Sequence, residues 1–200
     1  MVAHFARALR SLTGLFQSAP TAGVTELRFA VIGGLAVSTW GQVRATQDID
    51  VLADSAPSPV HTFAVRKNLA ALWEAQGCVV EWHSGLADDP IPLLLRLTLP
   101  PPNAMTVDVL WAWRPWQREA VKRASVVRVA RASIPVLHPE DLILMKLQAG
   151  GPQDLLDVEN ILAANPPALD RPRLLQMAST LRLKIALERC MRRVGASGSR

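Results

Sequence analysis

Short apolar runs bounded by turn-forming residues recur along the first two thirds of the chain and stop near residue 135. Each run has the length of an ordinary β-strand, and several are separated by segments rich in helix formers. After Pro139 only helix-forming patterns remain. Strands mixed with helices, followed by helices alone, predict an α+β fold: a mixed β-sheet flanked by helices, with an α-helical C-terminal extension. The expected strands cover residues 27–32, 48–53, 78–82, 93–99, 105–111 and 125–130.

The change of pattern predicts an α+β domain over residues 1–135 and a helical extension over 136–200. The expected helices cover residues 35–40, 61–76, 115–124, 140–149, 153–164 and 173–193. A further helix is expected at about 3–16, where apolar residues recur at helical spacing: Phe5, Leu9, Leu12 and Phe16. This segment has no acidic residue, so an organellar transit peptide is the alternative. The tail from Gly195 to Ser199 predicts partial disorder.

Composition excludes several classes of protein. Half of the 200 residues are apolar, which allows a buried core and excludes a wholly disordered chain. No apolar stretch approaches the roughly 20 residues of a membrane span, and no secretory signal is evident, so a cytoplasmic protein without a membrane partner is expected. Cys78 and Cys190 are far apart, which excludes a disulfide scaffold. The net charge of +5 is concentrated after Asp170, and such a basic end attracts polyanions.

Two aspartates stand at the start of the apolar run 48–53, although aspartate is disfavoured in strands. Because strand side chains alternate, Asp48 and Asp50 point the same way while Ile49 points into the core. Two carboxylates on one face repel each other unless a cation lies between them, and Mg²⁺ prefers such oxygen ligands. The alternative is a structural role, in which Asp48 caps a turn and Asp50 is solvated on an edge strand.

A third aspartate, Asp108, is embedded in the strand-like run 105–111. If its strand lies beside the one that carries Asp48 and Asp50, three carboxylates can share two metal ions about 4 Å apart. Such a site suits in-line attack on a phosphate, with one metal at the attacking hydroxyl and the other at the leaving pyrophosphate.

Gly33 and Gly34 lie where an expected strand passes into an expected helix. Glycines at such a turn let backbone N–H groups approach a phosphate, and the helix N-terminus adds favourable partial charge. A glycine pair alone is a weak signal. A glycine pair followed closely by Asp48-Ile49-Asp50 is a much stronger one.

These residues resemble the signature of the polymerase-β-type nucleotidyltransferase superfamily, carried here by Gly33-Gly34-Leu35-Ala36 and by Arg44-Ala45-Thr46-Gln47-Asp48-Ile49-Asp50. The downstream segment is similar to the AbiEii-like bacterial branch, which includes nucleotidyltransferase toxins of type IV toxin–antitoxin systems. That similarity is carried by His138-Pro139-Glu140-Asp141-Leu142, Lys146, Ala149-Gly150 and Asp154-Leu155-Leu156-Asp157-Val158. The resemblance covers roughly residues 28–162 and leaves the first helix and the basic tail outside.

The resemblance implies a cytoplasmic transferase that moves a nucleoside monophosphate (NMP) from ATP or another nucleoside triphosphate (NTP) to a hydroxyl. Asp48 and Asp50 would hold Mg²⁺, and Asp108 would be the third carboxylate and candidate general base. The implied nucleotide-binding residues are Gly33, Gly34, Arg44, Thr46, Lys146 and Asp154. Blander interpretations stay open: Thr46 orients the aspartate loop, Arg44 pairs with an acid, and Lys146 extends from a buried helix face.

One departure bears on catalysis. The branch often has an arginine a few residues after the lysine that Lys146 matches, and here Gly150-Gly151-Pro152-Gln153 occupies that place. The alternative function is therefore a catalytically impaired module that still binds nucleotide or RNA. For an active enzyme, three acceptors stay open: an RNA such as tRNA, a partner protein, or a small hydroxyl compound. No DNA partner is expected.

Overall fold

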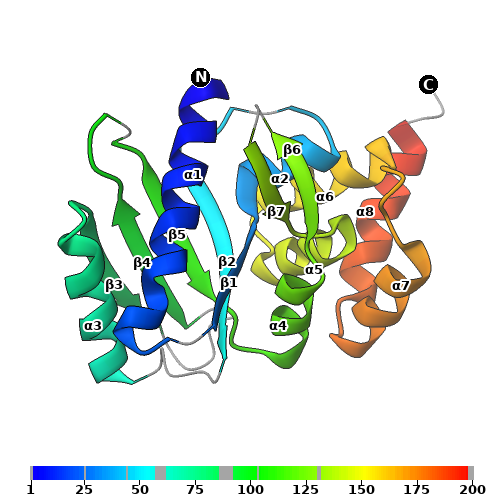
Figure 1. Ribbon diagram of the computed structural model, residues 1–200. Coiled ribbons are helices and arrows are strands. Elements are labelled where there is room, and N and C mark those ends of the chain that lie inside the picture. Colours follow the sequence, from blue (N-terminus) through cyan, green and yellow to red (C-terminus); the bar gives the residue numbers. More distant parts are fainter. Residues whose placement is uncertain are drawn as a thin grey trace. The chain divides into compact units, whose positions relative to one another are not determined.

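The computed structural model describes residues 2–24, 26–43, 45–56, 62–85, 92–102, 104–129 and 132–197. The chain divides into two compact units, each built from two stretches of sequence. The first unit comprises Met1–Val31 and Thr46–Val136, and the second comprises Ile32–Ala45 and Leu137–Arg200. The segment from Ile32 to Ala45, which the sequence pattern places in the first domain, therefore belongs to the second unit. Figure 1 shows the elements of both units.

The described strands of the first unit form one seven-stranded mixed sheet in the order β3-β4-β5-β2-β1-β7-β6. Strand β2 is antiparallel to β1 and parallel to β5, and β1 is parallel to β7. The α+β class with a mixed sheet is thus confirmed. The strands are β1 (Glu26–Val31), β2 (Ile49–Ala56), β3 (Val79–Ser84), β4 (Leu93–Thr98), β5 (Thr106–Trp111), β6 (Ser125–Val129) and β7 (Ala132–Val136).

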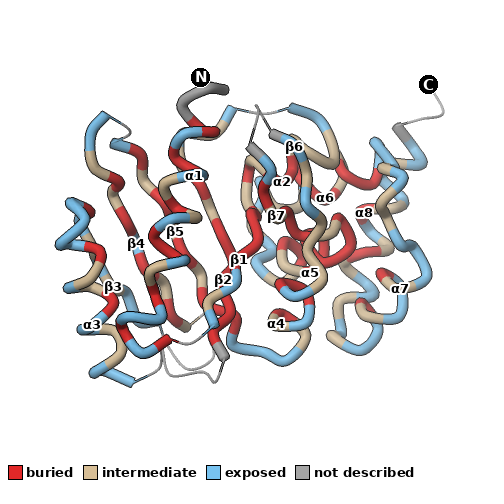
Figure 2. The backbone as a smooth tube through the Cα atoms, in the orientation of Figure 1, coloured by how far each residue is buried: buried red, intermediate tan, exposed pale blue. Residues whose placement is uncertain are grey.

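Helix α1 (Val2–Ser18) packs its apolar stripe into the core of the first unit. Leu9 and Leu12 are fully buried, and the Phe16 ring meets the edge of Phe29 on β1 with 4.9 Å between ring centroids. The first unit also contains η1 (Ala19–Ala22), α3 (Phe63–Glu74) and α4 (Pro115–Lys122). The amphipathic helix expected near the N-terminus is therefore part of the folded core, as the buried segments of α1 in Figure 2 show.

The second unit is helical: α2 (Gly33–Trp40), α5 (Pro139–Ala149), α6 (Pro152–Ala164), α7 (Arg171–Thr180) and α8 (Lys184–Ser197). Helix α2 belongs to this unit, and its C-terminal end packs closely against α6. A Cβ atom built on Gly41 would lie 3.3 Å from backbone atoms of Asn160 and Ile161, so any larger residue would have to push the α6 backbone away by a few tenths of an ångström. The Trp40 indole Nε1 also donates a hydrogen bond to the Leu137 carbonyl oxygen at 2.7 Å.

The structure differs from the elements expected from the sequence at three places. The helix expected over 173–193 is two helices, because the chain turns between α7 and α8 with Arg182 in a left-handed conformation at φ 61°. Strand β7 was not predicted, and it contains Pro135, a residue that cannot donate a backbone hydrogen bond to a neighbouring strand. Disorder was expected from Gly195, but α8 continues through Ser197, and 198–200 lie outside the described residues. In the part of the chain that the structure covers, no helix is long and apolar enough to span a membrane.

Candidate functional site

Three carboxylates meet on two neighbouring strands of the first unit. Strand β2 begins at the fully buried Ile49, so the flanking Asp48 and Asp50 share the opposite face. The parallel register of β2 with β5 places Asp50 directly opposite Asp108. Ligand oxygens of Asp48, Asp50 and Asp108 all lie within 4.8 Å of one another. The adjacency that the sequence pattern required is therefore present, and these three residues are named below as the carboxylate cluster.

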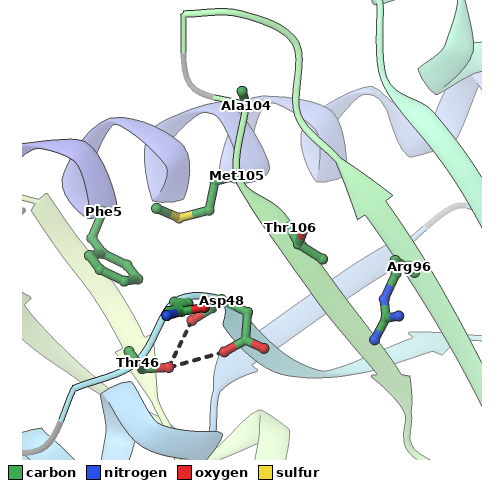
Figure 3. A pocket seen from close by; sticks show the side chains of 8 residues that line it. Phe5, Thr46, Asp48, Arg96, Ala104, Met105 and Thr106 are labelled. Carbon is green, nitrogen blue, oxygen red and sulfur yellow. Dashed lines mark hydrogen bonds between the residues drawn. The ribbon is translucent and has the colours of Figure 1, made fainter.

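The loop before β2 orients the first carboxylate. The Thr46 hydroxyl lies 3.1 Å from Asp48 Oδ1 and 3.2 Å from the Asp48 carbonyl oxygen, the two contacts drawn in Figure 3. This geometry supports the interpretation of Thr46 as a residue that orients the aspartate loop. Arg44, the other residue implied before the aspartate pair, lies outside the described residues.

Arg96 on β4 contacts the carboxylate cluster and was not among the site residues predicted from the sequence. The antiparallel register of β4 with β5 sets Arg96 opposite Asp108. Its Nε donates to Asp108 Oδ1 at 2.8 Å and its Nη2 donates to Asp108 Oδ2 at 2.8 Å, a two-pronged ion pair. The pKa of the Arg96 guanidinium is raised, first by this hydrogen bond and then by the charge of Asp108. Arg96 is the only charged residue in the apolar run 93–99, and this is the sequence signal that could have identified it as a site residue.

A pocket of about 810 Å³ opens beside the cluster, entirely within the first unit. Its polar lining includes Asp48 and Arg96, and its apolar lining includes Met105 and Phe5 of helix α1. Figure 3 shows these side chains around the pocket together with Thr46, Ala104 and Thr106. A pocket of this size holds a nucleotide-sized or drug-sized molecule. Helix α1, which lies outside the family resemblance, thus contributes to the wall of the candidate site.

The donor set of the cluster fits a hard divalent cation. All three side chains offer carboxylate oxygens, the ligands that Mg²⁺ prefers, and they converge closely enough to share an ion. Asp50 and Asp108 are half-buried, so their charges are less screened than those of a surface group. The geometry is compatible with a divalent metal site, and the metal-binding role of the three aspartates stays a prediction.

The glycine pair begins helix α2 in the second unit. Gly33 has a φ of 60°, a conformation that side-chain-bearing residues rarely adopt, which accounts for glycine at this turn. The Gly34 carbonyl oxygen accepts a hydrogen bond from the Ser38 hydroxyl at 2.9 Å, an ordinary contact within the helix. The role in phosphate binding that the resemblance implies for Gly33 and Gly34 stays a prediction.

Lys146 on α5 is buried and paired within the second unit. Its Nζ lies 3.0 Å from Asp154 Oδ1 and 2.7 Å from Asp157 Oδ2, both on helix α6. Lys146 is 8% exposed and Asp157 is fully buried, while Gln153 Nε2 donates to the other Asp157 oxygen at 3.1 Å. These contacts support a structural role that joins α5 to α6. The nucleotide-binding role implied for Lys146 and Asp154 stays a prediction.

The Gly150-Gly151-Pro152 segment, where the branch often has an arginine, is the turn between these two helices. Gly150 ends α5 in the left-handed conformation with a φ of 67°. Gly151 caps the N-terminus of α6, and Pro152 occupies its first turn. The segment that departs from the AbiEii-like pattern therefore forms the turn that joins α5 to α6.

Comparisons with known proteins give similarities of overall structure only, since no family model and no curated protein sequence matches the chain. An antigenic nucleotidyltransferase-like protein from Paracoccidioides brasiliensis aligns with a TM-score of 0.46 and 16% identity, over 90% of this chain and 91% of that one. ANT(2")-Ia in complex with adenylyl-2"-tobramycin aligns with a TM-score of 0.42 and 14% identity, over 92% and 97%.

Cid1 in complex with its short product ApU aligns with a TM-score of 0.41 and 10% identity, over 82% of this chain and 41% of that one. The Paracoccidioides protein is the one of these three whose name describes it as nucleotidyltransferase-like. At these scores and identities the similarities assign no family and no activity to the chain. What the chain can do chemically therefore follows from the carboxylate cluster and its pocket.

Proposed function

We propose that this protein is a metal-dependent nucleotidyltransferase, which transfers an NMP from an NTP to an acceptor hydroxyl and releases pyrophosphate. One observation carries the proposal: Asp48, Asp50 and Asp108 converge to within 4.8 Å on adjacent parallel strands. Three carboxylates this close together repel one another unless a cation offsets their charge, and phosphoryl transfer is the chemistry that such metal-binding clusters commonly serve. The AbiEii-like sequence pattern agrees with this proposal.

Mg²⁺ ions bound to the cluster would neutralise the charge of the triphosphate and lower the pKa of the acceptor hydroxyl. The protein supplies position: Thr46 holds Asp48, and the register of β2 with β5 holds Asp50 beside Asp108. Both Asp108 oxygens accept hydrogen bonds from Arg96, so the lone pairs that face the guanidinium are already engaged. A role for Asp108 as metal ligand or as general base is therefore expected to require Arg96 to release at least one oxygen.

The pocket beside the cluster is proposed to take the part of a substrate that lies next to the reacting phosphate. Its lining combines charge, hydroxyl groups and the apolar surface of Phe5 and Met105. Such a lining suits a nucleoside or a small hydroxyl compound. An RNA end is the acceptor that also fits the basic C-terminal end of the chain, and RNA modification would agree with a role in a toxin–antitoxin system.

The test is transfer of label from each α-labelled NTP, in the presence of Mg²⁺, to bulk tRNA, cell lysate or small hydroxyl acceptors. Wild-type protein runs beside a double variant, Asp48→Asn with Asp50→Asn, which removes two ligand charges with little change of shape. The matched control is Glu119→Gln, a carboxylate on α4 that pairs with Lys122 and is not in the cluster. We expect the double variant to lose at least about 100-fold in transfer and the control to keep it.

The labelled product identifies the acceptor as RNA, protein or small molecule. Transfer that survives in the double variant would disprove the role of the carboxylate cluster. No transfer under any condition, with Mg²⁺–NTP binding retained, would identify the chain as the impaired binding module instead. If the wild-type protein shows neither label transfer nor Mg²⁺–NTP binding, the proposed metal site is rejected.

A further inference from the structure

Arg96 is the feature of the cluster that the nucleotidyltransferase pattern does not explain. It comes from β4, outside the motif residues, yet it binds both oxygens of Asp108. Its side chain is 45% exposed, whereas that of Asp108 is 13% exposed. The guanidinium therefore lies at the solvent-accessible edge of the cluster while its partner is held within the sheet.

The charge balance of the cluster explains this pair. Three carboxylates within 4.8 Å of one another repel, and a guanidinium on one of them offsets part of that repulsion. A divalent cation bound to the same carboxylates would remove the need for Arg96 and would repel it. Asp108 also cannot offer its best-placed lone pairs to a metal and to a two-pronged guanidinium at once. Metal binding and the ion pair of Arg96 with Asp108 are therefore coupled.

The released guanidinium has a second place to bind. Arg96 lines the same pocket as Asp48, as Figure 3 shows, so a small rotation of its flexible stem moves the donors along the pocket wall. Phosphate oxygens accept the same paired N–H groups as a carboxylate, with similar geometry. A nucleotide phosphate delivered to the cluster would meet Arg96 at this edge.

We propose that Arg96 is a positioning residue that exchanges partners: it holds Asp108 in the metal-free cluster and binds a nucleotide phosphate once a divalent cation takes Asp108. This inference rests on the proposed function. The same guanidinium would thus pair with Asp108 in the empty site and with a nucleotide phosphate in the loaded site. It also adds Arg96 to the residues that determine how tightly the metal–nucleotide complex binds.

The experiment measures Mn²⁺ binding and Mg²⁺–ATP binding separately, by calorimetry, for wild-type protein, Arg96→Gln and Arg96→Lys. The matched control is Arg28→Gln, an arginine on β1 whose side chain is 46% exposed, pairs with Glu26 and does not line the pocket. Circular dichroism and thermal unfolding confirm that each variant is folded. If ATP is not the donor, the NTP that gives the strongest binding replaces it.

We expect Arg96→Gln to bind Mn²⁺ alone about three- to tenfold more tightly, because a competing positive charge is gone. The same variant should bind Mg²⁺–nucleotide about tenfold more weakly, because a charge-assisted contact to phosphate is lost. Arg96→Lys, which keeps the charge without the paired donors, should bind Mn²⁺ as the wild type does and recover part of the nucleotide affinity. Arg28→Gln should change neither constant. The opposite directions of the two effects are specific to an exchange of partners.

Weaker Mn²⁺ binding by Arg96→Gln would show that the arginine only supports Asp108, and would overturn the exchange. Unchanged values for both ligands would show that the pair is an inert surface contact. Asp50→Asn separates these failures from failure of the proposed function: it should abolish Mn²⁺ binding in the same assay. If the wild-type protein itself binds no Mn²⁺, the proposed function fails and this inference fails with it.

Discussion

Replacing Lys146 by methionine should destabilise the second unit of the protein strongly. The lysine Nζ lies 2.7 Å from Asp157 Oδ2 and 3.0 Å from Asp154 Oδ1, and Asp157 is fully buried. Methionine retains most of the stem but leaves the Asp157 carboxylate without its cation in the interior. Removing one partner of a buried ion pair costs about 3–5 kcal/mol of unfolding free energy.

The lower end of that range is expected here, because Gln153 still donates one hydrogen bond to Asp157 at 3.1 Å. About 3 kcal/mol corresponds to a fall in Tm of roughly 6–12 °C for a chain of this length. Adding Asp157→Asn to Lys146→Met removes the stranded charge and should restore more than half of the lost stability. Asp154→Asn is the matched control, since its side chain is 30% exposed, and it should cost no more than about 1 kcal/mol.

Urea unfolding followed by circular dichroism measures these free energies, and calorimetric titration with Mg²⁺–ATP measures nucleotide binding. The structural interpretation requires a large loss of stability in Lys146→Met and a rescue by Asp157→Asn. If Lys146→Met unfolds like the wild type and instead loses nucleotide affinity, the structural interpretation is refuted. The role in phosphate binding implied by the family resemblance would then be correct.

Three further changes test the packing of the chain. Leu12→Ala should cost about 3 kcal/mol in urea unfolding, because Leu12 is fully buried in α1; a cost below 1 kcal/mol would mean that α1 is dispensable. Gly41→Ala should cost about 1–3 kcal/mol, since its Cβ would press on the α6 backbone at 3.3 Å, and an unchanged Tm would contradict that close contact. Burial raises the pKa of the Cys78 thiol above its ordinary 9.0, so the stability it contributes holds below pH 9 and falls as the pH rises through the higher value. The difference in unfolding free energy between the wild type and Cys78→Ala should therefore become smaller between pH 8 and pH 10.5. A difference that stays constant over this range would refute the raised pKa of Cys78.

The carboxylate cluster was largely predictable because a charged residue inside an apolar strand needs a reason to be there. Asp48, Asp50 and Asp108 met that condition, and their strands pair as expected. Arg96 met it too, as the only charged residue in the run 93–99, but a single arginine does not say which strand its partner occupies. That information lies in the register of β4 with β5, which forms only in the folded sheet.

The division of the chain was harder to predict, because it depends on contacts between distant segments. Helix α2 joins the second unit through Gly41 and Trp40, whose contacts lie on α6 and at Leu137. Local sequence carries no sign of such partners. The turn between α7 and α8 was missed for a related reason: residues 173–193 contain neither glycine nor proline, and Arg182 takes the left-handed conformation that usually marks a glycine.

The discontinuous second unit has a consequence for how the protein is made. Helix α2 ends at Trp40, and α6, the helix it fits against, begins at Pro152. At about 5–20 residues per second, a ribosome needs roughly 6–22 s to synthesise the intervening chain. For most of that interval, until α5 (Pro139–Ala149) is synthesised, the buried face of α2, including Ala36 and Val37, has no helix of its own unit to cover it. A nascent chain is therefore exposed to chaperones and proteases at α2 until the last third of the protein has left the ribosome.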